Sequence, residues 1–368
     1  MKYNWQQNDW LQFSYNLGDF SELLERLNTL PHHLAGILRA LPEDVATETT
    51  VDFLVSEAIK TSEIEGEYLS REDVRSSICA NLGIFNDSYI AGDPRAKGIA
   101  DLMTSVRTTF AQPLSEQMLF DWHTQLMLGV SHINKGKWRS NPEPMRVISG
   151  PIGKWKTHFE APPSIRVPDE MQSFIDWFNQ TAPGGSREIK SAAVRAAIAH
   201  LHFESIHPFE DGNGRIGRAL AEKVLFQGFG APILVSLSQT IEAGKKDYYS
   251  ALKSAQTANE ITSWIGYFLE TVFKAHQQAE QRIDFVIRKT HYLDKYRDSL
   301  SERQLKVIMR IMQEGPEGFT GGMTAKKYCS LTSVSKATAT RDLQQLENIG
   351  ALKKLGQGRT TSYVLPWL

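Results

Sequence analysis

The sequence is poor in cysteine, the residue that stabilises many small secreted proteins through disulfides and many zinc-binding domains through metal ligation. Only two cysteines, Cys79 and Cys329, occur in 368 residues, and they lie far apart in no metal-binding spacing. This excludes a disulfide framework and argues against a zinc site. No apolar run approaches the ~18 residues that a membrane span needs, so no membrane partner is expected.

The chain also lacks the basic and then apolar start of a secretory signal. It begins MKYNWQQNDW, and a cytoplasmic protein is therefore expected. The net charge is only −1, and 41% of the residues are hydrophobic, as in a globular protein. Because 368 residues are more than one ordinary core holds, the sequence predicts two or three domains.

Helical periodicity dominates most of the chain. Over 49–67, apolar residues recur every three or four positions and form one apolar face. The helix predicted over 186–206 opens on Ser186, because serine is a preferred N-cap residue. Further helices are predicted over 115–127 and 167–182, and another that ends at Gly228 and Gly230.

Residues 144–163 depart from this helical pattern. Two short extended runs flank Gly150, Pro151 and Gly153, which are turn-forming residues. The segment therefore predicts a β-hairpin with a loose loop.

The last ~70 residues form a separate, basic region. Residues 301–368 hold ten Lys and Arg against five Asp and Glu, a net charge of about +5, so the rest of the chain is acidic. Three helical stretches are followed by KKLGQGRTTSYVL, which alternates like a two-stranded wing. This order predicts a winged helix-turn-helix domain.

The densest chemistry lies between two long predicted helices, in HPFEDGNGRIGR over 207–218. Gly212, Asn213 and Gly214 stand where a loop enters a helix. Backbone N–H groups at that point are unpaired and backed by the positive end of the helix dipole. Glycines let a phosphate approach them closely, so this turn predicts an anion-binding cradle.

The charged residues of the same segment suit a bound nucleotide. Arg215 and Arg218 share one helix face and can clamp a polyphosphate. Asp211 is an oxygen ligand that suits Mg²⁺, and His207 can accept a proton near neutral pH. No covalent nucleophile stands among them, which favours in-line transfer from a nucleotide to an acceptor hydroxyl. Each residue taken singly could equally be structural.

The segment resembles the signature of Fic domains, H-P-F-x-D/E-G-N-G-R-x-x-R, and matches it at every fixed position. The resemblance covers about 115–281, and the opening YNWQQNDW is similar to the N-terminal region of some bacterial Fic proteins. It implies a mainly α fold, in which a Fic helical core carries a β-hairpin flap, beside the winged helix-turn-helix domain. We expect an N-terminal helical region over 1–114, a catalytic core with a helical extension over 115–290, and the winged helix over 300–368.

Fic proteins transfer AMP from ATP to a Ser, Thr or Tyr hydroxyl of a protein, with Mg²⁺ or Mn²⁺. The resemblance implies that His207 is the base and Asp211 the metal ligand. It places Arg215 on the β-phosphate and Arg218 on the γ-phosphate. Tyr248, in KKDYYSAL, would lie near the adenine, although a tyrosine there equally suits a core. The implied ATP-binding set is Gly212, Asn213, Gly214, Arg215, Ile216, Gly217, Arg218 and Tyr248.

The resemblance also implies how a target protein binds. The hairpin over 144–163 would be the flap that docks the target's backbone as an added strand. The motif does not fix the donor, since some Fic relatives use UTP, phosphocholine carriers, or ATP for phosphorylation.

A second stretch, TSEIEG over 61–66, resembles the inhibitory pattern S/T-x-x-x-E-G/N of the same family. It sets Thr61, Glu65 and Gly66 as inhibitory residues. Glu65 would reach Arg218 and take the place of the γ-phosphate, because a carboxylate and a phosphate compete for one guanidinium. The alternatives are an ordinary acidic helix end, or a glutamate that orients water for the removal of AMP.

The basic tail leaves a rival function open, that of a DNA-binding transcriptional regulator acting through 324–363. Its predicted recognition helix offers Lys336, Thr338, Thr340 and Arg341, and the wing offers Arg359, for contacts with phosphates and base edges. The alternative is a winged helix used for protein binding or for homodimerisation.

Overall fold

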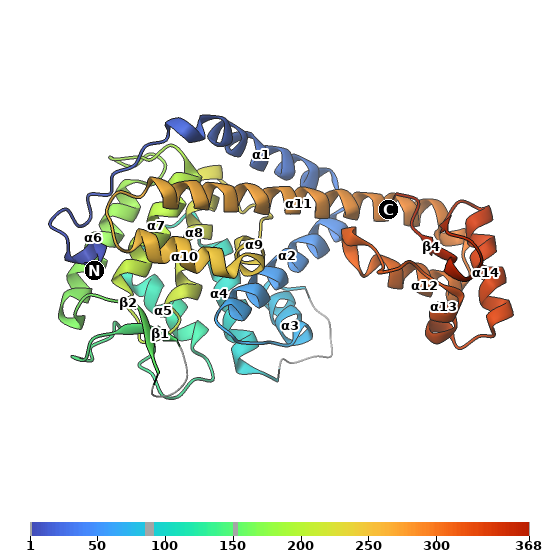
Figure 1. Cartoon of the computed structure of the whole chain (residues 1–368), viewed down its shortest axis with the longest axis horizontal. Helices are drawn as coiled ribbons and strands as arrows, with labels where there is room; N and C mark the ends of the chain where they lie inside the picture. Colours follow the sequence, from blue (N-terminus) through green and yellow to red (C-terminus); the bar gives the residue numbers. More distant parts are fainter. Residues whose placement is uncertain (1, 85–91, 150–153, 368) are drawn as a thin grey trace. The chain divides into compact units, whose positions relative to one another are not determined.

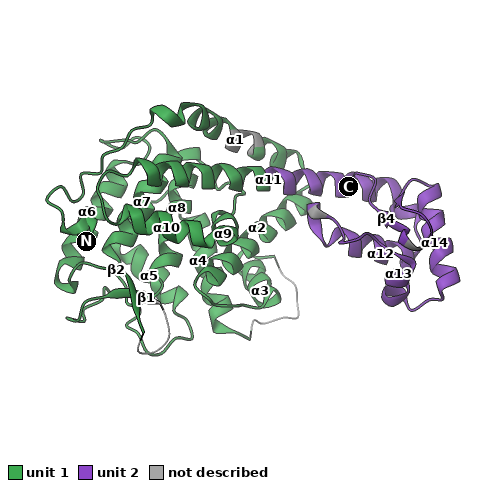
Figure 2. Cartoon of the chain, in the orientation of Figure 1, with its two compact units in different colours: residues 1–279 green, residues 280–368 purple. Residues whose placement is uncertain are grey.

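The computed structural model describes residues 2–84, 92–149 and 154–367. It is mainly helical (Figure 1). The chain forms two compact units, Met1–Ala279 and Glu280–Leu368 (Figure 2), and the boundary falls within helix α11 (Thr262–Tyr296). The domain limits expected from the sequence, at residues 114, 290 and 300, stay predictions.

The first unit begins with helices that precede the motif. Helix α2 contains most of the helix expected over 49–67, but it starts earlier, directly after Pro42, and ends before Gly66, whose φ is 83°. Helix α4 begins with Asp93 as its N-cap and Pro94 in its first turn, a favoured start. These helices are α1 (Ser21–Ala40), α2 (Glu43–Ile64), α3 (Arg71–Asn81), α4 (Pro94–Thr108) and α5 (Glu116–Leu126).

The core of this unit is the pair α7 (Ala192–Ile206) and α8 (Asn213–Phe229), with α6 (Val167–Gln180) against α7. Every residue of α7 is buried. Helix α8 ends as expected, with Gly230 in the left-handed region at φ 70°.

The expected start of α7 at Ser186 is wrong. The N-cap is Ser191, whose side chain accepts a hydrogen bond from the Val194 N–H. The preceding residues turn back instead, because the N–H groups of Arg187 and Ile189 donate to carbonyls at the end of α6. These hydrogen bonds hold residues 187–189 against the end of α6, and the helix begins only after them.

The hairpin expected over 144–163 is present. Strands β1 (Arg146–Ser149) and β2 (Lys156–Glu160) pair antiparallel, with Val147 opposite Phe159. The expected turn residues Gly150, Pro151 and Gly153 lie outside the described part of the chain. Helices α9 (Leu237–Ala243) and α10 (Lys245–Ala255) follow α8, and short 3₁₀ turns lie at Asn4–Gln6, Gly18–Phe20 and Ser164–Arg166.

The second unit has its own apolar core. Helices α12 (Glu302–Met312), α13 (Ala325–Thr332) and α14 (Lys336–Asn348) precede the hairpin of β3 (Lys353–Leu355) and β4 (Ser362–Val364). Met323 adds a bridge to Tyr363 on β4. Short 3₁₀ turns lie at Arg297–Ser299, Gly315–Glu317 and Gly358–Thr360. The element order is the expected one, and the winged-helix assignment itself stays a prediction.

Among the described residues, no helix combines the length and the apolar character that crossing a bilayer requires.

Candidate active site

The loop between α7 and α8 holds His207 in an uncommon conformation. Its φ and ψ are 52° and 60°, the left-handed region, which costs a non-glycine residue about 1–2 kcal/mol. Its N–H donates to the Phe203 carbonyl, which ends α7. Such a conformation persists only where surrounding contacts hold it.

Arg139 supplies several of those contacts. Its Nε donates to the His207 carbonyl at 2.7 Å, and its backbone N–H donates to the Pro208 carbonyl at 2.9 Å. Its Nη2 reaches the Pro162 carbonyl, just beyond β2, at 2.6 Å. The side chain is buried, and burial lowers the pKa of Arg139 to about 10. One guanidinium thus joins the His207 loop to the base of the flap.

Asn213 holds the other side of the loop. Its side chain accepts from the Phe209 N–H and donates to the Phe209 carbonyl, both at 2.9 Å. The amide is therefore occupied, and only the backbone of Asn213 remains for a ligand. With Gly212 and Gly214 it opens α8, where first-turn N–H groups have no partner inside the helix.

Glu65 lies against this first turn. Its Oε1 is 2.8 Å from Arg218 Nη2, and a side chain at Gly214 would collide with the same oxygen. Thr61 accepts from Arg218 Nε through its hydroxyl at 2.8 Å and from Nη2 through its carbonyl at 2.9 Å. Burial alone would lower the pKa of Arg218, but the Glu65 carboxylate raises it.

Glu67 makes a second pair of the same kind, which the sequence pattern did not indicate. Its Oε2 is 2.6 Å from Arg215 Nη1, and Arg215 is buried. Gly66, between the two glutamates, adopts φ 83°, so the chain turns there. Both motif arginines are therefore engaged by carboxylates of one short segment.

A cavity of about 580 Å³ opens beside these groups. Tyr248 lines it, but its hydroxyl is buried and lies 2.8 Å from His200 Nε2. Its neighbour Tyr249, which sequence reasoning passed over, is 40% exposed. The other lining residues include Glu65, His158, Glu204, His207, Lys245 and Gln256.

Comparison with known proteins identifies a family over part of the chain. Residues 113–225 match the Fic/DOC family. The chain contains a Fic domain. Residues 3–84 match a domain of unknown function, DUF4172, so the segment that carries Thr61 and Glu65 lies outside the Fic match.

Individual relatives give the same picture. A probable protein adenylyltransferase of Aquifex aeolicus is 25% identical over 214 residues, 58% of each chain. The protein adenylyltransferase Fic of Nematostella vectensis is 25% identical over 197 residues, 52% of this chain and 41% of that one. The chain therefore spans between two fifths and three fifths of these relatives' length.

One solved structure matches almost end to end. A Fic family protein from Desulfovibrio desulfuricans G20 has a TM-score of 0.54 over 94% of this chain and 96% of its own. The sequence identity is 19%, so the likeness concerns the fold.

A smaller cavity of about 190 Å³ lies between the first turn of the Fic motif helix and β1. Asp211 lines it with a side chain that is 54% exposed. In the described ranges no three His, Cys, Asp or Glu side chains gather as a metal cluster. One exposed carboxylate beside an anion cradle nevertheless fits Mg²⁺, which takes one or two protein carboxylates and completes its shell with phosphate oxygens and water.

The other predicted residues of the Fic motif lie deeper. Ile216 is fully buried, and the backbone of Gly217 packs against Glu204 and His200. Neither lines the cavities described above. Their assignment to the nucleotide stays a prediction.

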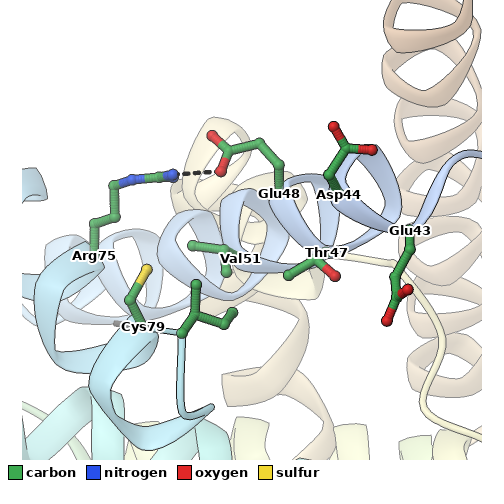
Figure 3. A pocket seen from close by; sticks show the side chains of 8 residues that line it. Glu43, Asp44, Thr47, Glu48, Val51, Arg75 and Cys79 are labelled. Carbon is green, nitrogen blue, oxygen red and sulfur yellow. Dashed lines mark hydrogen bonds and ion pairs between the residues drawn. The ribbon is translucent and has the colours of Figure 1, made fainter. Parts of the chain in front are cut away.

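Another pocket, of about 650 Å³, lies between α2 and α3, away from the Fic motif (Figure 3). Glu43 and Asp44 belong to the first turn of α2, where acidic groups interact favourably with the positive end of the helix dipole. Glu48 pairs with Arg75 at 2.5 Å. The charged groups that line this pocket thus have structural roles in the pair of helices α2 and α3.

Proposed function

We propose that the chain is a protein adenylyltransferase, which moves AMP from ATP to a hydroxyl of a target protein and of itself. One observation carries the proposal. Two buried arginines and a free helix N-terminus converge beside His207, and carboxylates already occupy them. A site that holds carboxylates in this way offers the donors that a triphosphate requires. The relatives described above, from Aquifex aeolicus and Nematostella vectensis, are named as a probable and an assigned protein adenylyltransferase, which agrees with the proposal.

The chemistry needs only these groups. His207 takes the proton of the acceptor hydroxyl as that oxygen bonds to the α-phosphorus. The bond from the α-phosphorus to the bridging oxygen breaks, and pyrophosphate leaves. Arg215 and Arg218 hold the β- and γ-phosphates, so that the leaving oxygen stays in line. Asp211 would hold Mg²⁺, which neutralises phosphate charge.

The proposal includes autoinhibition. Glu65 engages Arg218 where the γ-phosphate would bind, so ATP can enter only in an unproductive arrangement. Glu67 acts in the same way on Arg215. The alternative in which Glu65 instead orients water to remove AMP uses the same position.

The target would dock on the hairpin. Strands β1 and β2 pair only with each other in the described part of the chain, so each has a free edge. Ile148 and Trp155 are exposed at 45% and 56% and offer apolar contacts. Val147 lines both cavities, so a strand added here would pass close to His207.

Labelled nucleotides test the function. Purified wild type and the Glu65→Gly variant are incubated with labelled ATP or UTP, with and without cell lysate. We expect label from the α-phosphate of ATP on protein, more in Glu65→Gly and none in His207→Ala. Transfer from UTP alone would show that UTP and not ATP is the donor. Loss of AMP from a pre-labelled protein would support the activity that removes AMP. No covalent label under any condition would contradict the proposal.

A second function, DNA binding, is favoured by the surface of the C-terminal unit. The helix expected to read DNA, α14, exposes Lys336, Thr340 and Arg341. One of its two acids, Asp342, is buried and paired with Arg303 at 2.7 Å, so this carboxylate does not oppose phosphate. Lys353 and Lys354 on β3 are exposed as well. The side chain of Arg359 lies outside what the structure describes.

Salt dependence separates this function from protein binding. Fluorescence anisotropy with duplex DNA should show affinity that falls steeply with salt. Arg341→Glu should weaken it, while Arg288→Glu, on a part of α11 outside that surface, should not. If the affinity for DNA does not change with salt, or if both variants lose the same affinity, the unit is a protein-binding module.

A further inference from the structure

We propose that Glu204 is the positioning residue that orients the imidazole of His207 for proton transfer. The inference rests on the proposed function, because His207 acts there as the base. Neither the Fic signature pattern nor the inhibitory pattern includes Glu204, which stands one helical turn before His207 on α7.

The geometry sets the carboxylate against one ring nitrogen. Glu204 Oε2 lies 3.6 Å from His207 Nδ1, and both side chains are largely buried. Within the described structure, His207 Nδ1 and Glu204 Oε1 have no hydrogen-bond partner. A distance of 3.6 Å is longer than a hydrogen bond. Catalytic hydrogen bonds are often this long without substrate and tighten when substrate binds.

Glu204 differs from Glu57, one of the other buried glutamates of the first unit. Glu57, on α2, accepts hydrogen bonds from the Ser236 hydroxyl and from both the N–H and the hydroxyl of Ser238. No described serine, threonine or backbone N–H donates to the Glu204 carboxylate. A buried carboxylate without such donors needs a charged or polar partner. His207 is the partner that the geometry offers.

The surroundings keep this carboxylate charged. Burial alone would raise the pKa of Glu204, but His207, His200 and Arg218 together hold it below its ordinary value. His200 cannot compete strongly as a cation, because burial lowers its pKa. An ionised Glu204 is an acceptor only, so it selects the ring form that carries a proton on Nδ1.

Gly217 gives an independent reason to see a built site. A Cβ at this position would lie 2.5 Å from Glu204 Oε1 and 3.2 Å from His200 Nδ1. A glycine inside α8 weakens the helix, yet here it leaves the room that the Glu204 side chain fills. Gly217 of the Fic motif thus serves the carboxylate behind the base.

The role follows from the chemistry of imidazole. A carboxylate on Nδ1–H fixes the neutral tautomer and the ring plane, and leaves Nε2 to take the acceptor proton. It also offsets the positive charge that the ring gains in that step. A buried aspartate performs this service for the histidine of serine proteases.

The test compares isosteric variants in the uninhibited Glu65→Gly background. E204Q should lower kcat for AMP transfer by about 100-fold or more, in the range of a general-base effect, with the KM and Kd for ATP unchanged. G217A should lower kcat in the same way, because it displaces the carboxylate. E170Q is the matched control: Glu170 is also buried and paired, on α6 with Arg166, and its variant should keep the parent kcat.

Two further measurements separate positioning from mere stability. In the His207→Ala background, E204Q should cause no further loss of residual transfer, since there is no ring to orient. Independently of activity, ¹⁵N NMR should show the neutral His207 ring protonated on Nδ1 in the parent and a mixed tautomer in E204Q. Equal losses in both backgrounds, a kcat no lower than that of E170Q, or an unchanged tautomer would overturn the inference. If the parent transfers no AMP, the proposed function fails, and the tautomer still decides whether Glu204 orients the ring.

Discussion

At the scale of single residues, two glutamates of one turn engage two arginines of another. The pair Glu65–Arg218 could be expected from the sequence, because TSEIEG and the Fic motif each resemble a known pattern. The pair Glu67–Arg215 could not, because it depends on the turn at Gly66 and on how that turn meets α8. Spacing along the chain does not show which side chains meet across 148 residues.

The Glu65–Arg218 pair predicts opposite effects for its two members. Glu65→Gly should raise AMP transfer, because it frees the guanidinium for the γ-phosphate, whereas Arg218→Ala should not, because the phosphate then loses its partner. Removing one partner of a buried pair can cost on the order of 3–5 kcal/mol. Melting temperatures must therefore accompany the rates from labelled ATP. If Glu65→Gly stays folded and binds ATP but is no faster than wild type, Glu65 is an ordinary helix end.

Glu67 extends that prediction. Glu67→Gln should give a smaller gain in AMP transfer than Glu65→Gly, since Glu67 is paired with Arg215 alone, and the double variant should exceed either one. The rates of the four proteins are compared at several ATP concentrations. A control is Glu63→Gln, whose pairing with Lys60 does not involve a motif arginine. A Glu67→Gln rate equal to that of Glu63→Gln would assign Glu67 to surface charge.

Asp211 gives a prediction about the metal. Asp211→Ala should remove most of the transfer and its dependence on Mg²⁺, because it is the protein oxygen ligand assigned there. Glu210→Ala is the matched control, since Glu210 instead accepts hydrogen bonds from Asn134. The measurement is a Mg²⁺ titration of the rate, together with binding of the metal in the presence of ATP. A titration curve like that of wild type would place the ligand elsewhere.

At the scale of elements, helix ends separate what local sequence decides from what packing decides. The end of α8 follows from Gly230, which takes a conformation that few other residues adopt easily. A serine does cap α7, but it is Ser191 and not the expected Ser186, because the backbone N–H groups of residues 187 and 189 hold the chain against the end of α6.

Arg139 shows a link between elements that no pattern indicated, because its partners are backbone carbonyls. Arg139→Lys should lower kcat for AMP transfer by at least about 10-fold, since a misplaced reacting group can cost about 100-fold, while ATP affinity stays close to wild type. Arg195→Lys is the control, because Arg195 is also buried and bonds the Phe178 carbonyl. Both should lower the melting temperature, and only Arg139→Lys should lower kcat. Equal rates in the two variants would make Arg139 a purely structural residue.

At the scale of the whole molecule, buried histidines tie stability to pH. Burial lowers the pKa of His123 to about 4 and that of His202 to about 3. Between pH 6.5 and these values the unfolded chain binds protons that the folded chain does not. The free energy of unfolding should therefore fall as pH falls below 6.5, by up to about 1.4 kcal/mol per pH unit for each ring.

Urea unfolding between pH 7.5 and 5 measures this slope. His202→Gln should flatten it by about one proton, whatever the stability of that variant at pH 7. His200 and His276 shift in the same direction, so some slope should remain. Identical slopes in wild type and His202→Gln would show that His202 is protonated or exposed in the folded state.

The close approach of Glu65 to Gly214 has a consequence for how the protein distinguishes nucleotides. Because Glu65 fills the space beside that glycine, the glutamate and the terminal phosphate exclude each other, whereas a nucleotide that ends at the β-phosphate does not need that space. ADP should then bind wild type and Glu65→Gly with similar affinity, and only ATP should gain from the substitution. The carboxylate belongs to the same chain, so it competes with the γ-phosphate of ATP at a fixed effective concentration, and ADP competes with ATP for the rest of the site. The protein would therefore respond to the ratio of ATP to ADP and not to their sum.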